Sequence, residues 1–130
     1  MPLIHSEISS PYGRYVDELK KGLLAYQFST AVGKPVFYPR VRCPFSGLDD
    51  VLEWRISKGS GTVYSTSVVF PKDAAPYNVA LIDMDEGFRL MSRVVDTDPI
   101  SVKIGLRVHF RVEQVDANED PIPVFFPLVS

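Results

Sequence analysis

Two short segments of the chain share one frame, Ser29-Thr30-Ala31-Val32-Gly33 and Cys43-Pro44-Phe45-Ser46-Gly47. A zinc knuckle has the pattern C-x2-C-G, because two thiolates clasp one metal ion and glycine tolerates the positive φ that often follows. Both glycines stand at the expected places. The four ligand positions are held by Ser29, Val32, Cys43 and Ser46. One thiolate with two hydroxyls is a poor structural zinc site, so we predict a degenerate, metal-free knuckle.

Arginines and one tyrosine form a second set of candidates, for binding a ligand or a partner. Guanidinium groups bind phosphates in a bidentate manner and stack on flat rings, so an aromatic side chain nearby extends their chemistry. Exposed arginines are also ordinary solubility residues, and this alternative stays open. The candidates are Tyr38, Arg40, Arg42, Arg89, Arg93, Arg107 and Arg111.

Catalytic constellations are not evident in the sequence. Cys43 has no local histidine to activate its thiol, so we expect a small, partly buried residue rather than a nucleophile. His109 falls on the wet side of a predicted strand and His5 lies near the chain start, so no catalytic pair is predicted. No G-x-S-x-G elbow occurs. We interpret three carboxylates near a predicted turn as a solvated loop: Asp83, Asp85 and Glu86.

The first element that must position these residues is a helix. Ser10 followed by Pro11 is typical of an N-cap with proline at the first helical position. Apolar residues then recur at helical spacing, at Tyr15, Val16, Leu19, Leu23 and Leu24. We predict a tail and amphipathic helix in residues 1–26, with the helix spanning 11–26. Residues 27–50 contain several prolines and glycines, and we assign them to the degenerate ribbon.

Runs of β-branched and aromatic residues dominate the chain beyond residue 51. They predict five strands, at 61–70, 77–83, 88–95, 106–115 and 122–128. Asp85-Glu86-Gly87 predicts a tight hairpin turn, and a helical turn within 96–104 would fall where a five-stranded OB barrel has its connecting element. The predicted fold class is therefore mostly β, with an OB-fold barrel over residues 51–130.

Composition and charge narrow the function classes. Hydrophobic residues make up 45% of the 130 residues and the net charge is −2, so the overall field disfavours nonspecific binding of nucleic acid. No stretch approaches the run of about 20 apolar residues that a membrane span needs, and the first ten residues lack a signal-peptide pattern. We therefore expect a cytoplasmic protein without a membrane partner. A single cysteine excludes an internal disulfide.

Several short sequence motifs follow one another in a specific order after the degenerate knuckle. They are Val36-Phe37-Tyr38-Pro39-Arg40, Leu52-Glu53-Trp54, Gly61-Thr62-Val63-Tyr64-Ser65, Tyr77-Asn78-Val79-Ala80-Leu81-Ile82-Asp83 and Arg89-Leu90-Met91-Ser92. In this order the chain resembles the family of rubredoxin-like zinc-ribbon plus OB-fold accessory proteins encoded beside thiolases. The resemblance covers residues 12–128 in one register.

The resemblance implies a noncatalytic subunit that serves a thiolase-like, retro-aldol or hydratase enzyme acting on acyl-CoA. Coenzyme A or acyl-CoA is the shared ligand that it implies for the arginines and Tyr38. No cofactor of the chain's own is expected, and a homo-oligomer is left open.

The alternative function is a single-stranded nucleic-acid binder, because OB barrels use exposed strand faces for base stacking. The negative net charge and the mostly aliphatic strands weigh against it.

Overall fold

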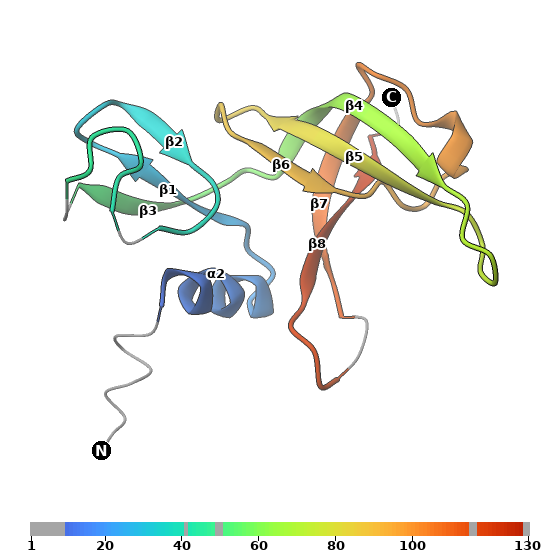
Figure 1. The fold of residues 1–130 in the computed structure, drawn as a ribbon, viewed down its shortest axis with the longest axis horizontal. Coiled ribbons are helices and arrows are strands. Elements are labelled where there is room, and N and C mark those ends of the chain that lie inside the picture. Colours follow the sequence, from blue (N-terminus) through green and yellow to red (C-terminus); the bar gives the residue numbers. More distant parts are fainter. Residues whose placement is uncertain (1–9, 41, 49–50, 115–116, 129–130) are drawn as a thin grey trace. The chain divides into compact units, whose positions relative to one another are not determined.

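The computed structural model describes residues 10–40, 42–48, 51–114 and 117–128, and the chain forms two compact units that divide between Ser57 and Lys58 (Figure 1). The division that the sequence predicts, at residues 1–26, 27–50 and 51–130, stays a prediction.

The N-terminal unit begins with helix α2, Pro11–Lys20. Ser10 caps it as the sequence predicts, since its Oγ accepts a hydrogen bond from the Gly13 N–H at 3.1 Å. The helix is shorter than the predicted span 11–26. It ends because Gly22 takes a φ of +83°, a left-handed conformation typical of the residue that follows a helix. Residues 25 and 26, which the helical spacing had included, belong to a strand.

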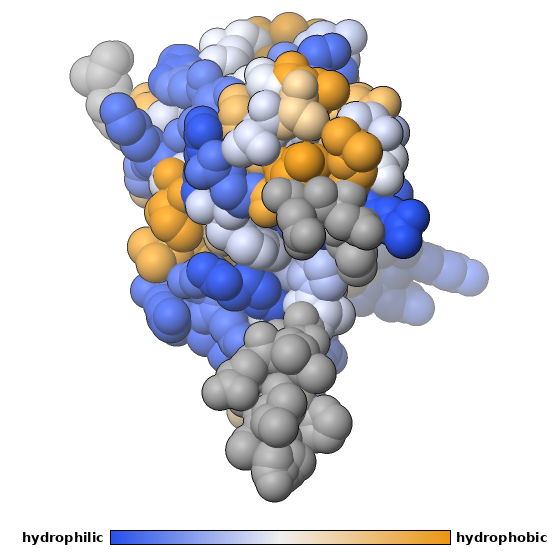
Figure 2. Space-filling model, turned by 90° about the vertical axis from the view of Figure 1, so that its left-hand side faces the viewer, coloured by the Kyte–Doolittle hydropathy of each residue, from blue (hydrophilic) through white to orange (hydrophobic). Residues whose placement is uncertain are grey.

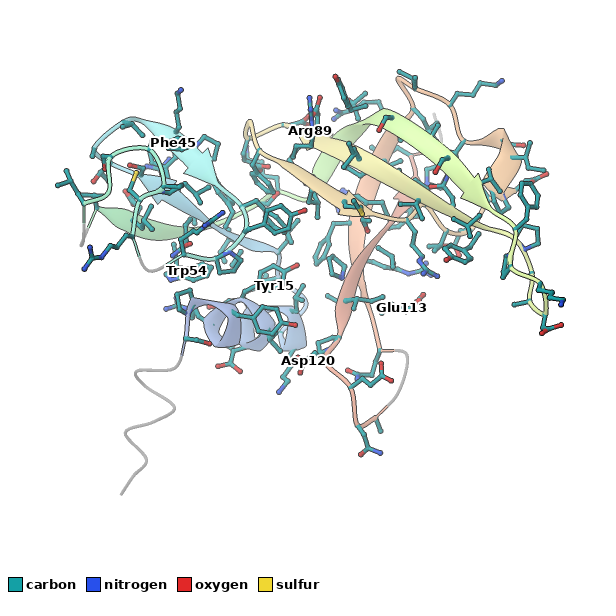
Figure 3. The ribbon with its side chains drawn as sticks, in the orientation of Figure 1. Tyr15, Phe45, Trp54, Arg89, Glu113 and Asp120 are labelled. Carbon is teal, nitrogen blue, oxygen red and sulfur yellow. The ribbon has the colours of Figure 1, made fainter. Side chains whose placement is uncertain are left out.

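A three-stranded sheet completes this unit, in the order β2-β1-β3. Its strands are β1 (Ala25–Ser29), β2 (Lys34–Val36) and β3 (Leu52–Ile56), and both pairings are antiparallel. The Tyr15 ring meets the edge of the Phe37 ring at a centroid distance of 5.6 Å. Arg14 lies over the Trp54 ring, 5.5 Å from its centroid, so the helix is held to the ribbon by aromatic packing (Figure 3).

The C-terminal unit is a five-stranded sheet in the order β6-β5-β4-β7-β8. The elements are β4 (Ser60–Val69), β5 (Tyr77–Met84), β6 (Arg89–Ser92), the 3-10 helix η1 (Pro99–Ser101), β7 (Arg107–Glu113) and β8 (Ile122–Pro127). All four pairings are antiparallel. The mostly β class and the five barrel strands are as predicted, and η1 lies in the predicted connection.

The β5–β6 hairpin has the turn that the sequence predicts. The Met84 N–H donates to the Phe88 carbonyl at 2.8 Å, and Gly87 has a φ of +103°. Glycine is required there because other residues rarely adopt a positive φ. Gly61 is needed for a different reason: a Cβ there would lie 2.8 Å from the Asp83 carbonyl oxygen.

Asn78 is a polar side chain buried inside the barrel, at 2% exposure. Its Nδ2 donates to Thr66 Oγ1 at 2.6 Å and to the Ser67 carbonyl at 3.3 Å. Its Oδ1 accepts the Val94 N–H at 3.2 Å. One amide therefore connects β5 to β4 and to the segment that follows β6.

The segment after β6 also joins the sheet to β8. Val94 and Phe125 form a parallel bridge, the Val95 N–H donates to the Phe125 carbonyl at 2.7 Å, and the Phe125 N–H donates to the Arg93 carbonyl at 3.0 Å. These short contacts link the two outer strands of the sheet and so close the barrel.

Replacing Asn78 with leucine leaves the buried Val94 N–H without its acceptor. We expect a loss of about 1 to 3 kcal/mol in the free energy of unfolding, the usual cost of one unsatisfied buried group. Urea unfolding and amide hydrogen exchange at Val94 would measure it. Thr66→Val is the matched control, since Asn78 keeps its other two bonds, and should cost about 1 kcal/mol or less. Equal stability of N78L and the wild type would contradict the role assigned to this amide.

Candidate functional site

The two knuckle-like turns keep the same backbone hydrogen bonds although three of the ligand positions have changed. In the first turn the Gly33 N–H donates to the Ser29 carbonyl at 2.8 Å, and the Val32 N–H donates to Ser29 Oγ at 3.3 Å. In the second turn the Gly47 N–H donates to the Cys43 carbonyl at 2.7 Å, and the Ser46 N–H donates to Cys43 Sγ at 3.4 Å. Both glycines have a positive φ, +68° and +74°.

A hydrogen bond joins the turns where a metal would sit in a zinc knuckle. Cys43 Sγ donates to Ser29 Oγ at 3.1 Å, and the two side chains are 1% and 0% exposed. Val32 offers no donor atom, and Ser46 Oγ accepts the Leu48 N–H at 3.3 Å. Within the described residues no three His, Cys, Asp or Glu side chains gather to hold a metal ion. This donor set does not fit a structural zinc ion.

The environment of Cys43 perturbs its thiol in two opposing ways. Burial raises the pKa of the Cys43 thiol. Hydrogen bonds with the side chains of Ser29 and Ser46 and with the backbone of Phe45 and Ser46 outweigh burial, so the pKa of Cys43 falls to about 7. Accessibility nevertheless limits reaction, because the side chain is 1% exposed. The sequence predicts a partly buried cysteine, and the structure buries it almost completely; its lack of reactivity stays a prediction.

We expect the native protein to contain no stoichiometric zinc and to melt at the same temperature with and without EDTA, because its remaining ligands supply little binding energy. Elemental analysis and thermal melts would test this. The variant S29C/V32C/S46C is the positive control, since it restores four thiols on the same turns, and its melting temperature should depend on EDTA. Stoichiometric zinc in the wild-type protein would contradict the prediction.

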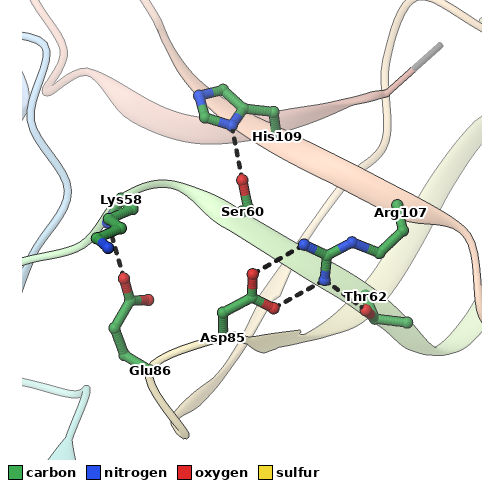
Figure 4. Close-up of polar contacts among 7 residues, drawn as sticks. All are labelled: Lys58, Ser60, Thr62, Asp85, Glu86, Arg107 and His109. Carbon is green, nitrogen blue, oxygen red and sulfur yellow. Dashed lines mark hydrogen bonds and ion pairs between the residues drawn. The ribbon is translucent and has the colours of Figure 1, made fainter. Parts of the chain in front are cut away.

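Three of the four predicted barrel arginines are held by carboxylates. Arg89 pairs with Asp83 at 2.5 Å and lies 3.5 Å from the centroid of the Tyr64 ring. Arg107 forms a bidentate pair with Asp85, at 2.7 and 2.8 Å (Figure 4). Its hydrogen bonds hold the pKa of the Asp85 carboxyl below the usual range. Arg111 forms a similar ion pair with Asp96, at 2.5 Å.

Strand register brings two of these arginines into one row. Arg89 is opposite Asp83, Asp83 is opposite Thr62, and Thr62 is opposite Arg107, so the row crosses four strands. Arg107 also donates to Thr62 Oγ1 at 2.9 Å. An incoming anion would have to compete with the carboxylates already bound to these side chains.

Arg93 differs from the other barrel arginines. Its guanidinium lies 4.7 Å from the centroid of the Tyr77 ring, and no carboxylate in the described part of the chain pairs with it. It borders an open hollow of the barrel surface. The hollow is lined by Val79, Met91, Ser92, Arg93, Ile122 and Pro123.

The remaining predicted residues lie in the N-terminal unit. Tyr38 is 57% exposed, and its ring contacts that of Phe37 at 5.2 Å. The backbone of Arg40 is fixed by the Gln27 side chain, which accepts from the Arg40 N–H at 2.7 Å and donates to its carbonyl at 2.8 Å. The side chains of Arg40 and Arg42 are exposed. Apolar patches lie among hydrophilic ones on the surface that Figure 2 shows.

One pair of chemically active groups was missed by sequence reasoning. Ser60 Oγ lies 3.1 Å from His109 Nδ1, because these residues face each other in the β4–β7 register (Figure 4). No local motif signals a contact between residues 49 positions apart. Asp85, the nearby carboxylate, is bound by Arg107 and does not orient the imidazole. Among the described residues, the arrangement therefore lacks the third member of a Ser-His-Asp triad.

None of the helices in the described ranges is long and apolar enough to cross a membrane.

Comparison with known proteins gives matches over most of the chain. The family model "ChsH2, C-terminal OB-fold domain" matches residues 54–113. A DUF35 domain-containing scaffold protein from Methanothermobacter thermautotrophicus is 37% identical over 94 residues, covering 67% of this chain and 71% of that protein. A probable enoyl-CoA hydratase alpha subunit from Thermomonospora curvata is 36% identical over 93 residues, covering 67% of this chain but only 28% of that protein.

Solved structures match as well. A chain of the Ltp2-ChsH2(DUF35) aldolase has a TM-score of 0.79 and 30% identity, over 94% of this chain and 98% of that one. A DUF35 protein of unknown function from Sulfolobus solfataricus has a TM-score of 0.62 over 82% of this chain and 83% of its own, and at 17% identity it shows the fold alone. These matches confirm the resemblance found in the sequence, and the chain belongs to the DUF35 family.

Proposed function

We propose that this protein is a noncatalytic accessory subunit that binds and supports an enzyme acting on acyl-CoA, of the thiolase-like, retro-aldol or hydratase kind. The observation that carries the proposal is the end-to-end match, at 30% identity, to a chain of the Ltp2-ChsH2(DUF35) aldolase. The scaffold name of the Methanothermobacter relative and the hydratase subunit name of the Thermomonospora relative support it too.

In this proposal the chemistry belongs to the partner enzyme. No carboxylate in the described ranges orients the Ser60 and His109 pair, and Cys43 is buried. The arginines on the barrel are mostly engaged in ion pairs that shape the surface. These features suit a subunit that presents surfaces, and they supply no assembled set of nucleophile, base and oxyanion donors.

Contact with coenzyme A is the finer part of the proposal. Among the predicted residues, Arg40 combines an exposed guanidinium, no carboxylate partner in the described segments, and Tyr38 two residues away with an exposed ring. Because Gln27 holds both backbone groups of Arg40, its side chain projects from a fixed point. A phosphate and an adenine ring are the groups that such a pair would bind.

We expect the protein alone to turn over no acyl-CoA thioester, and to co-elute with a separately encoded acyl-CoA enzyme when the two are co-expressed. Size-exclusion chromatography and assays of the partner's activity would measure this. Failure to bind any such enzyme would contradict the proposed function.

The variant Y38A/R40A should weaken either complex formation or CoA binding by the complex about tenfold or more, since a charge-assisted hydrogen bond contributes about 1.5 to 3 kcal/mol. The isolated fold should remain intact because both side chains are exposed. The matched control is K34A/F45A, which removes another cation–aromatic pair from the same unit. Calorimetry would measure both the binding of the partner and the binding of CoA by the complex. Equal binding by the wild type and Y38A/R40A would place these residues outside the site.

A single-stranded nucleic-acid binder is the second candidate, favoured by the exposed ring of Tyr64 and the half-buried ring of Tyr77 on the barrel strands. Arginines already lie over both rings, and a base would have to displace them in order to stack. Fluorescence anisotropy with labelled single strands should therefore show only weak, unselective binding at about 0.15 M salt. Submicromolar affinity would favour this second candidate over the first.

A further inference from the structure

Strand β6 stands at the end of the barrel sheet and pairs only with β5. The two partners of an antiparallel ladder alternate between hydrogen-bonded and non-hydrogen-bonded pairs. Met84 and Phe88 are hydrogen-bonded, so the pairs at Leu90 and Ser92 are hydrogen-bonded as well. The backbone groups of Arg89 and Met91 must then point away from β5.

No strand of the described chain lies on that outer side along Arg89 to Met91. Backbone hydrogen bonding with β8 begins only at Arg93, whose carbonyl accepts the Phe125 N–H. The barrel therefore has a short open edge with two N–H groups and two carbonyl groups directed outward. Such an edge is a template for pairing with another extended segment.

The open edge borders the hollow described above. Met91 is 62% exposed, and the other apolar members of the lining are Val79, Ile122 and Pro123. The one polar hydroxyl, that of Ser92, donates to the Pro123 carbonyl at 2.8 Å. The hollow thus offers apolar contact to a side chain from a segment that pairs with β6.

The positive charge of Arg93 indicates which residue type the bound segment should carry. Arg93 lines the hollow, and its guanidinium has no carboxylate partner among the residues described, in contrast to Arg89, Arg107 and Arg111. A carboxylate reaching Arg93 would complete the pattern of ion pairs seen on the rest of the barrel.

A second copy of this chain is a poor occupant. Antiparallel pairing of two β6 strands centred on Met91 would place Arg89 opposite the second copy's Arg93 at both ends. Like charges directly opposite each other destabilise a sheet. Arg93, which has no carboxylate partner among the described residues, therefore favours a partner with an acidic residue.

We propose that the outer edge of β6 accepts an extended segment of a partner protein, which adds a strand to the barrel, places an apolar side chain against Met91 and sets a carboxylate against Arg93. For the identity of the partner as an acyl-CoA enzyme, this inference rests on the proposed function. The strand-accepting edge itself is defined by the barrel alone and can be tested without that enzyme.

The first test selects peptides from a phage-displayed library of random linear peptides on the immobilised full-length protein. We expect enrichment of peptides that combine β-branched or apolar residues with Asp or Glu. Failure to enrich any peptide would overturn the inference. Binding of decanoate, a small amphiphile with one carboxylate, is measured beside the peptides. If decanoate binds the hollow while no peptide does, the hollow is a site for a small amphiphile and the inference is also wrong.

Variants of the edge separate backbone pairing from side-chain contact. M91P removes the outward N–H while an edge strand tolerates proline, and it should weaken a selected peptide about tenfold or more. M91A keeps that N–H and should weaken it less. R93E should weaken acidic peptides, and a Glu→Lys change in the peptide should restore binding to R93E. This exchange does not depend on whether M91P folds. Equal binding by the wild type and R93E would count against the proposal.

The second test uses the complex with the acyl-CoA enzyme. The photo-crosslinker p-benzoylphenylalanine at position 91 should form a covalent crosslink to the partner. The control position is Ile104, which is 71% exposed in the same unit, and the same group there should form no crosslink. A complex that forms without a crosslink from position 91 overturns the inference and leaves the proposed function standing. Selected peptides that bind, with no acyl-CoA enzyme that does, support the edge and overturn the proposed partner. Dimers of the wild type that M91P abolishes would assign the edge to a second copy instead.

Discussion

Closure of the barrel depends on the buried amide of Asn78. The sheet has two outer strands, β6 and β8, and the backbone pairing that joins them lies in the short segment 93–95. Asn78 reaches this segment from β5 and accepts the Val94 N–H, while its own N–H groups are satisfied by β4. Because a buried amide without partners costs more than its bonds return, this side chain favours the one arrangement that satisfies all three contacts.

The same closure explains where the barrel is left open. Pairing with β8 starts at Arg93 and continues to Val95, so the first part of β6 extends beyond its neighbour. Strand β4 has a bulge between Val63 and Ser65, and it pairs with β5 along its length but with β7 only at its first residues. The charged row that includes Arg89 and Arg107 crosses the sheet at these first residues, where four strands are in register. Arg89, at the start of β6, thus belongs to an ion pair, whereas Arg93, which has no carboxylate partner among the described residues, lines the hollow beside the open edge.

Sequence patterns predicted the elements of the barrel well because each depends on nearby residues. Strand alternation, the glycine at position 87 and the proline after Asp98 act over a few positions. The helix was predicted too long because Leu23 and Leu24 continue the apolar spacing, whereas Gly22 between them and Lys20 ends the helix by its backbone conformation. The Ser60–His109 contact and the carboxylate partners of the arginines depend on strand register across distant segments. No local pattern encodes that register.

The N-terminal unit has sources of stability other than a metal ion. A structural zinc ion contributes about 10 to 16 kcal/mol in small peptides, and one hydrogen bond between Cys43 and Ser29 contributes only about 1 kcal/mol. The helix stabilises the unit by side-chain packing. Tyr15 and Leu19 are buried with the ribbon side chains, and the aromatic contacts of Tyr15 tie the helix to residue 37. The two turns then need only a local link to keep their shape. Gln27, a buried residue of β1, holds the backbone of Arg40 without help from either turn. The surface that carries Tyr38 and Arg40 is therefore maintained by the sheet and the helix, without a need for a metal ion at the two turns.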